Sequence, residues 1–96
     1  MLNKKSILKF NKYILKRYEA NLKDGVLYLY NVDNEDIWIG NSSSKDLIDE
    51  IDGIKTLDEI YQKMYLIFEG YDKSEVENSI NAILEELIKR GILEYS

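Results

Sequence analysis

The hydrophobic pattern of this 96-residue chain changes its period once, near Gly40 and Asn41, and this change constrains the fold most. Before it, apolar and polar residues alternate in short runs bounded by turn residues, which is typical of β-strands. After it, apolar residues recur every three or four positions, which is typical of amphipathic helices. Strands followed by helices predict an α+β fold, and the length suits a single domain over residues 1–96.

The first part of the chain predicts an antiparallel sheet. Strands are expected over Tyr13–Glu19, Val26–Tyr30 and Glu35–Ile39, with turn signals at Asp24-Gly25 and Asn31–Asn34 between them. Because only about four residues separate the last two strands, these should pair as a hairpin.

Two cap signals follow the strands and predict the first two helices. Asn41 or Ser42 can cap a short helix, which the pair Asp52-Gly53 should stop, since glycine tolerates the left-handed conformation that ends many helices. Thr56 and Glu59 have the spacing of a capping box, in which each side chain bonds the backbone N–H of the other residue. A second helix should therefore begin at this pair.

The third helix is the longest and is expected over Ser74–Arg90, after an Asp72 cap. Gly91 should end it, and a short extension follows. Three short helices joined by tight turns resemble a helix-turn-helix arrangement, with the hairpin as an N-terminal wing. The sequence thus predicts a three-stranded antiparallel sheet followed by three helices in a winged helix-turn-helix-like domain.

The composition excludes most catalytic chemistry. The chain contains no cysteine and no histidine, so disulfides, thiolate zinc sites, iron–sulfur clusters and Ser-His-Asp triads are unavailable. The adjacent carboxylates Asp49-Glu50 and Glu85-Glu86 point about 100° apart on a helix and cannot form a facing acid/base pair. We therefore expect no enzymatic activity, metal or cofactor, and the absence of a disulfide framework fits a cytoplasmic protein.

The net charge of −5 is unevenly distributed along the chain. Residues 1–23 hold seven basic residues and one acidic residue, leaving six basic and seventeen acidic residues in the remainder. Residues 1–12 are expected to form a flexible basic arm. No apolar stretch is long enough for a transmembrane helix, so we expect no membrane partner.

A nucleic-acid partner is the main alternative that the predicted fold raises, in the form of a winged-helix DNA-binding regulator. Such a protein needs a recognition helix rich in basic and amide side chains. The candidate helix over Ser74–Arg90 instead carries four glutamates, with Lys89 and Arg90 only in its last turn. An acidic protein repels phosphate backbones, so nucleic-acid binding is disfavoured.

The last predicted strand, Glu35–Ile39, lacks an evident partner on its far side, because no segment before Ile92–Tyr95 looks able to pair with it. Its free edge should carry unpaired backbone groups, with Glu35 and Asp36 as a charged guard. An extended peptide could pair there by β-augmentation. The alternation does not decide whether Trp38, the only tryptophan, faces the helices or the outer side of the sheet.

The segment GNSSSKDLIDEIDGIKTLDEI, residues 40–60, resembles the hallmark of PqqD-like proteins, the precursor recognition elements of ribosomally synthesised, modified peptides (RiPPs). The segment EVENSINAILEELIKRGIL similarly resembles the last helix of that family, and the likeness spans Tyr13 to Tyr95. Gly40 departs from the family pattern, which usually has an aliphatic residue there. The family pattern is matched at Asn41, Ser43, Leu47, Asp52-Gly53, Thr56 and Glu59-Ile60.

The resemblance implies a non-catalytic domain that binds the leader of a precursor peptide and delivers it to a modifying enzyme. Such enzymes include radical SAM proteins, cyclodehydratases and leader proteases. In the family, the leader adds as a strand to the third strand and lies against the third helix. Carried over to this chain, the implied peptide-binding residues are Glu35, Asp36, Ile37, Trp38, Ile39, Gly40, Ser79, Ala82, Ile83, Glu86 and Arg90.

By residue type, the strand backbone should supply the hydrogen-bond ladder, while Ala82 and Ile83 form an apolar contact surface. Glu35, Asp36 and Glu86 should favour a leader with a lysine or arginine near its apolar anchor.

Overall fold

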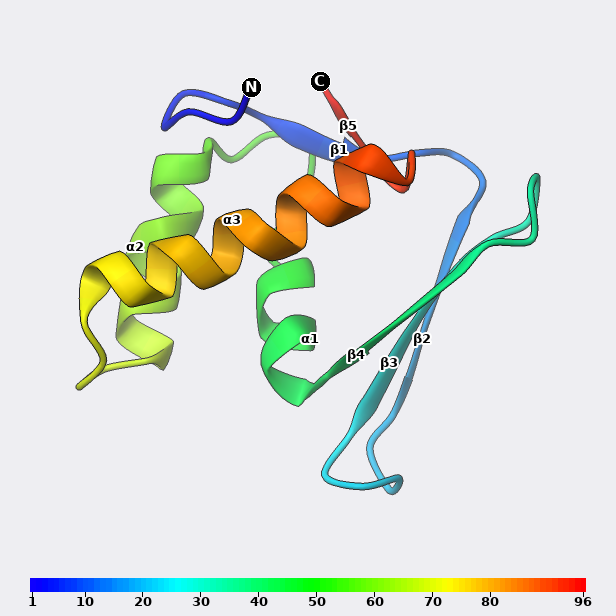
Figure 1. Ribbon diagram of the computed structural model, residues 1–96, viewed down its shortest axis with the longest axis horizontal. Coiled ribbons are helices and arrows are strands. Elements are labelled where there is room, and N and C mark those ends of the chain that lie inside the picture. The colour runs from blue at the N-terminus through cyan, green and yellow to red at the C-terminus, as the bar shows by residue number, and fades with distance from the viewer.

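The computed structural model describes residues 1–96 and contains two small antiparallel sheets and three helices (Figure 1). It confirms the predicted α+β class, whereas the finer winged helix-turn-helix assignment stays a prediction. The strands are β1 (Leu8–Phe10), β2 (Ile14–Glu19), β3 (Val26–Asn31), β4 (Ile37–Asn41) and β5 (Leu93–Tyr95). The helices are α1 (Ser42–Ile48), α2 (Leu57–Ile67) and α3 (Lys73–Lys89).

The three-stranded sheet has the order β2-β3-β4, with both pairs antiparallel. In its register Leu29 lies opposite Lys16 on one side and Trp38 on the other. Leu27 and Leu29 are buried against the helices because alternate residues of a strand point to the same face. The core therefore lies between this face and the helices.

The third predicted strand begins two residues later than expected, at Ile37 and not at Glu35. Glu35 has a φ of +62°, a left-handed conformation that a regular strand cannot contain. The turn before it is held by the Asn31 side-chain oxygen, which accepts the backbone N–H of Asp33 at 2.9 Å. Glu35 and Asp36 thus belong to the β3–β4 turn, and the strand continues instead to Asn41.

All three helices begin at side-chain caps that the sequence predicted. Asn41 accepts the backbone N–H of Ser44 at 3.0 Å, and Asp72 accepts that of Ser74 at 2.8 Å. Thr56 and Glu59 form the complete capping box. None of the helices combines the length and apolar character that crossing a membrane requires.

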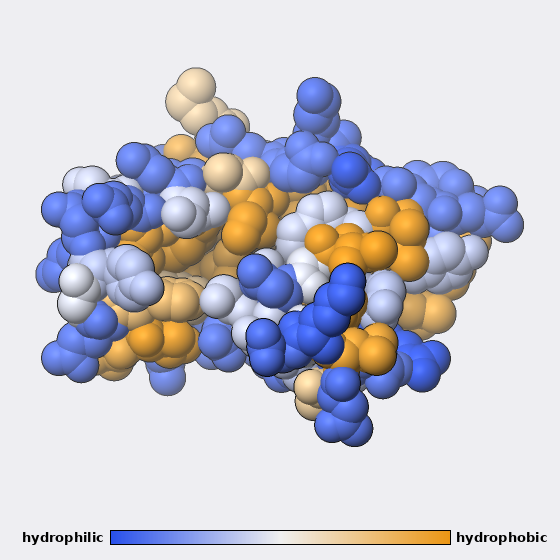
Figure 2. All heavy atoms as spheres, turned by 60° about the horizontal axis from the view of Figure 1, so that its bottom comes forward, coloured by the Kyte–Doolittle hydropathy of each residue, from blue (hydrophilic) through white to orange (hydrophobic).

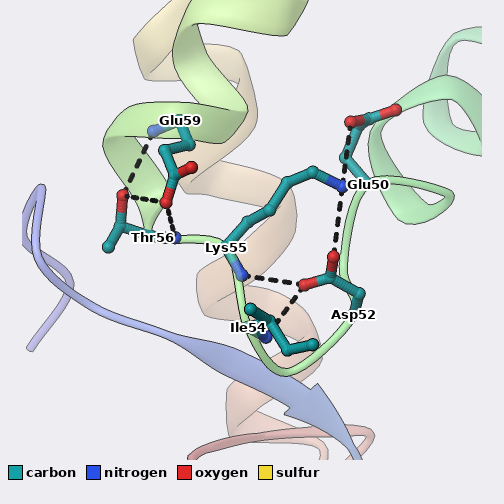
Figure 3. Close-up of polar contacts among 6 residues, drawn as sticks. All are labelled: Glu50, Asp52, Ile54, Lys55, Thr56 and Glu59. Atoms are coloured by element: carbon teal, nitrogen blue, oxygen red, sulfur yellow. Dashed lines mark hydrogen bonds and ion pairs between the residues drawn. The ribbon is translucent and has the colours of Figure 1, made fainter.

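The connection between α1 and α2 is held by Asp52 (Figure 3). Its carboxylate accepts the backbone N–H groups of Ile54 and Lys55, both at 2.8 Å, and Lys55 Nζ lies 3.1 Å from it and 3.5 Å from Glu50. These bonds, the two backbone N–H groups first, lower the pKa of Asp52 to about 2. Asp52, which matches the family pattern, therefore stabilises the backbone of its own loop.

The second sheet, β1 paired with β5, was not predicted. It brings the two ends of the chain together (Figure 1) and buries Leu8 and Leu93, which are 2% and 1% exposed. The Ser6 carbonyl oxygen also accepts the backbone N–H of Leu57 at 2.8 Å. The expectation of a flexible arm over residues 1–12 is therefore wrong for residues 6–10, because partners distant in sequence hold them.

Candidate peptide-binding site

The outer edge of β4 is unpaired, because β4 pairs only with β3 and the C-terminal strand pairs with β1. The backbone N–H of Asn31 bonds the Asp36 carbonyl oxygen at 2.9 Å, which sets the alternation along the hairpin. The backbone groups of Trp38 and Gly40 consequently face β3. Those of Ile37 and Ile39 face away from the sheet, and a free edge is present as expected.

The C-terminal end of α3 lies beside the start of this edge. Arg90 Nη1 donates to the Ile37 carbonyl oxygen at 3.3 Å and lies 3.7 Å from Asp36 Oδ1, while Arg90 Nε donates to Glu86 Oε1 at 2.8 Å. One guanidinium thus bridges a helix carboxylate, a turn carboxylate and an outward-facing carbonyl of β4. Sequence reasoning named all these residues but did not foresee this contact.

Trp38 faces the helices and packs against the core, which decides the alternative that the sequence left open. Ile37 and Ile39 lie on the opposite face, 45% and 59% exposed. The indole of Trp38 covers Gly40, where an added Cβ would come within 2.6 Å of two ring carbons and 2.8 Å of the Ser44 Cβ. The glycine at this position therefore leaves room for the tryptophan two residues earlier.

A pocket of about 430 Å³ opens where β4 ends, and Figure 2 shows an apolar hollow on the helical side of the molecule. Four parts of the chain contribute to it: the end of β4, α1, the end of α2 with the following turn, and α3. Apolar side chains supply most of the lining, and Glu75 is its only charged residue. The lining is Asn41, Ser43, Ser44, Leu47, Met64, Phe68, Tyr71, Glu75, Val76, Ser79, Ile80 and Ile83.

Two tyrosines of α2 fasten α3 and so hold one wall of this pocket in place. Tyr61 Oη donates to Asn81 Oδ1 at 2.5 Å, and the Tyr65 hydroxyl donates to the Glu77 carboxylate. Burial and then the Glu77 contact raise the pKa of Tyr65 to about 12, and burial also raises the pKa of Tyr61. Both phenols stay protonated donors at neutral pH.

The predicted helix residues separate into two groups along α3. Ser79 and Ile83 line the pocket, whereas Glu86 and Arg90 stand at the other end, near Ile37. Ala82 precedes Ile83 directly, is exposed and does not line the pocket. Glu35 lies in the β3–β4 turn and forms no ion pair, since the carboxylates that Arg90 contacts are those of Asp36 and Glu86.

Most of the pocket lining was missed by the sequence analysis, Phe68 and Tyr71 included. Their aromatic side chains flank Gly70, which the sequence marks only as a helix end. No local pattern relates this turn to β4, so only the packing of the helices places it beside the site. No group of three or more acidic side chains is arranged to hold a metal ion.

The outer face of the sheet carries a second, shallower depression of about 490 Å³. Leu15, Leu22, Tyr28, Tyr30 and Ile37 line it, together with the paired side chains of Arg17 and Glu19. Figure 2 shows separate apolar areas on the part of the molecule where the sheet lies. Nothing in the structure covers this face.

A family model described as coenzyme PQQ synthesis protein D (PqqD) matches residues 27–93, from β3 to the start of β5. The chain belongs to the PqqD family. PqqD proteins are non-catalytic accessory proteins of coenzyme PQQ synthesis, which places this chain in RiPP-related biosynthesis. Comparisons with curated proteins and with solved structures returned no significant match. The matched region contains β4, α3 and the pocket between them.

Proposed function

We propose that this PqqD-family protein binds the leader region of a ribosomally made precursor peptide and delivers it to a modifying enzyme, without catalysing a reaction itself. The observation that carries the proposal is the unpaired edge of β4, where Ile37 and Ile39 present backbone N–H and C=O groups beside α3. Such groups accept a further strand at little cost in strain, since the incoming backbone repeats the existing ladder.

The charge of α3 favours a peptide over nucleic acid as the partner. Its exposed or partly exposed carboxylates include Glu75, Glu77 and Glu85, and its two lysines, Lys73 and Lys89, lie only at its ends. A phosphate backbone along this helix would meet like charge over most of its length. No observation favours the alternative of a DNA-binding regulator.

The side chains around the edge support distinct roles in this proposal. Ile83, with Ala82 beside it, offers an apolar surface to side chains of the bound strand. Arg90 already neutralises part of the charge of Asp36 and Glu86, whereas Glu35 is unpaired. The turn therefore still carries net negative charge, and we propose that the leader has a lysine or arginine near its apolar anchor.

The modifying enzyme is proposed from the family alone: a radical SAM protein, a cyclodehydratase or a leader protease. A strand of five or six residues must be ordered on binding, and this ordering offsets much of the contact energy. We expect a dissociation constant on the order of micromolar to tens of nanomolar.

The test is a titration with the short peptide encoded beside the gene, followed by the fluorescence of Trp38. Ile39→Pro removes an N–H that faces away from β3, so the sheet keeps its ladder while the added strand loses a donor. We expect affinity to fall by about tenfold or more, whereas Ile39→Thr, which keeps the N–H, should bind normally.

Lys16→Pro is the matched control at the other edge of the sheet. The backbone N–H of Val32 bonds the Tyr13 carbonyl oxygen, and the alternation from that bond turns the Lys16 N–H away from β3. This variant should bind as the unmodified chain does. Equal binding by Ile39→Pro and Ile39→Thr, with both folded by circular dichroism, would refute strand addition at β4.

A further inference from the structure

We propose that the pocket at the end of β4 receives an aromatic side chain of the bound peptide, and that this residue lies just past the segment paired with β4. The inference rests on the proposed function, because it requires a strand on the β4 edge. It adds the chemical class of the anchor and its position along the peptide. Both follow from the pocket, from Gly40 and from the residues that surround them.

The pocket and the open edge are continuous. Asn41 is the last residue of β4 and also lines the pocket, and Ser43 follows at the rim. A strand that extends along Ile37 and Ile39 therefore arrives at the pocket mouth as it passes the end of β4. Ser79 and Ile83 of α3 form the facing wall, so the side chain that enters is held between strand and helix.

The position of the anchor follows from the alternation of side chains. Residues of the added strand that point inward stand level with Trp38 and Gly40, about 7 Å apart. The indole of Trp38 already covers Gly40 and leaves no depth there for a second large group. The next inward position lies beyond Gly40 at the pocket mouth. The anchor is therefore two residues past the one level with Gly40, whether the added strand is parallel or antiparallel.

The lining favours an aromatic ring. Phe68 and Tyr71 stand edge to face on the pocket wall, with centroids 6.2 Å apart and an angle of 81°. A third ring can extend such a pair, because aromatic rings prefer edge-to-face or offset contacts with one another. The volume of about 430 Å³ accommodates a ring. The hydroxyls of Ser43 and Ser79 at the same pocket can bond the polar tip of a tyrosine or tryptophan.

The charge of the pocket excludes acidic neighbours of the anchor. Glu75 is the only charged lining residue, and it is exposed at the start of α3. A carboxylate next to the inserted ring would be repelled by it. The peptide that fits therefore has an aromatic residue flanked by neutral or basic residues.

The experiment uses a phage-displayed library of linear peptides of about twelve residues, long enough to span β4 and reach the pocket. The full chain is the target, and binding of the selected peptides to the Ile39→Pro variant is measured afterwards. We expect enriched peptides to share one aromatic residue without an acidic neighbour. Enrichment without an aromatic residue, or no enrichment at all, would overturn the inference.

The selected peptide is then synthesised, together with a version in which alanine replaces the aromatic residue. Binding of the alanine version should be weaker by about tenfold or more. Ser79→Phe places a ring at the pocket mouth from an exposed position and should lower the affinity for the selected peptide similarly. Asn78→Phe, the matched control, adds the same ring at an exposed neighbour outside the lining and should leave affinity unchanged.

A second pocket variant keeps the inference testable if Ser79→Phe fails to fold. Tyr71→Ala removes part of the wall from a side chain that is 68% exposed, so the fold should persist while affinity for the selected peptide falls. If Ile39→Pro abolishes binding but both pocket variants and the alanine peptide behave normally, strand addition stands and the pocket inference fails. If the pocket variants lower the affinity for the selected peptide but Ile39→Pro does not, the peptide binds without adding to β4. The proposed function then fails instead.

Discussion

The three-stranded sheet has two free edges, β2 and β4, which are protected in different ways. β2 carries three charged residues of its own, Lys16, Arg17 and Glu19. The five residues of β4, Ile37–Asn41, include no charge. The only side-chain cover of its outward backbone is the hydrogen bond that Arg90 Nη1 donates to the Ile37 carbonyl oxygen. Charges within an edge strand prevent pairing permanently, whereas a side chain from another element can move aside.

This difference indicates which of the two edges can accept a partner strand. β2 turns back into β3, while β4 runs directly into α1 (Figure 1), accepts a hydrogen bond from Arg90 at the end of α3 and ends at the pocket. Backbone groups alone give affinity without selectivity, so a recognition edge also needs adjacent side-chain contacts. Only β4 combines both.

The largest expected effect concerns which side of β4 each N–H faces. Trp38→Pro removes a ladder donor and a packed indole, so the free energy of unfolding should fall by about 3 kcal/mol or more. Ile39→Pro should cost about 1 kcal/mol or less, because its N–H faces outward. Urea denaturation measures the free energy of unfolding of both variants. Similar losses for the two variants would mean that the register of β4 is wrong.

A smaller effect on stability, away from both edges, is expected at Asp52. Its folded pKa of about 2 lies below the ordinary value of 3.8, so its contribution is present above pH 4 and is lost as the pH falls toward 2. The urea midpoint of Asp52→Asn should lie below that of the unmodified chain at neutral pH, and the two should converge near pH 2. Peptide affinity should not change. A difference independent of pH would exclude the carboxylate as its source.

The charge preference of the β4 edge can be reversed. Asp36→Lys combined with Glu86→Lys should weaken binding of a basic leader by about tenfold at low salt and less at high salt. Isothermal titration at two salt concentrations measures this change. The matched reversal at the other edge, Glu19→Lys, should have no effect. Unchanged affinity at low salt would refute the preference for lysine or arginine.

The smallest effect is expected for the cover of the edge. Arg90→Ala frees the Ile37 carbonyl oxygen, and exposed ion pairs of this kind contribute about 0.2–1 kcal/mol. A peptide without acidic residues should therefore bind up to about fivefold more tightly. Arg17→Ala, at the β2 edge, should leave affinity unchanged. Weaker binding by Arg90→Ala would show that the arginine contacts the peptide and does not compete with it.

Much of the fold was predictable because its signals are local. The three caps at Asn41, Thr56 and Asp72 depend on residues two or three positions apart, and the structure forms all of them. The strands and helices follow from the period of apolar residues. The start of β4 was misplaced because Glu35 adopts a left-handed conformation that its residue type does not signal.

The amino-acid sequence alone determined the order of strands and helices, the helix starts, the acidic α3 and the family, since each depends on neighbours along the chain. Only the tertiary structure decided that Trp38 covers Gly40, that β5 pairs with β1, that Arg90 reaches Ile37, and that four elements enclose the pocket. These contacts join residues far apart in sequence. Their formation depends on how whole elements pack, which local periodicity does not encode.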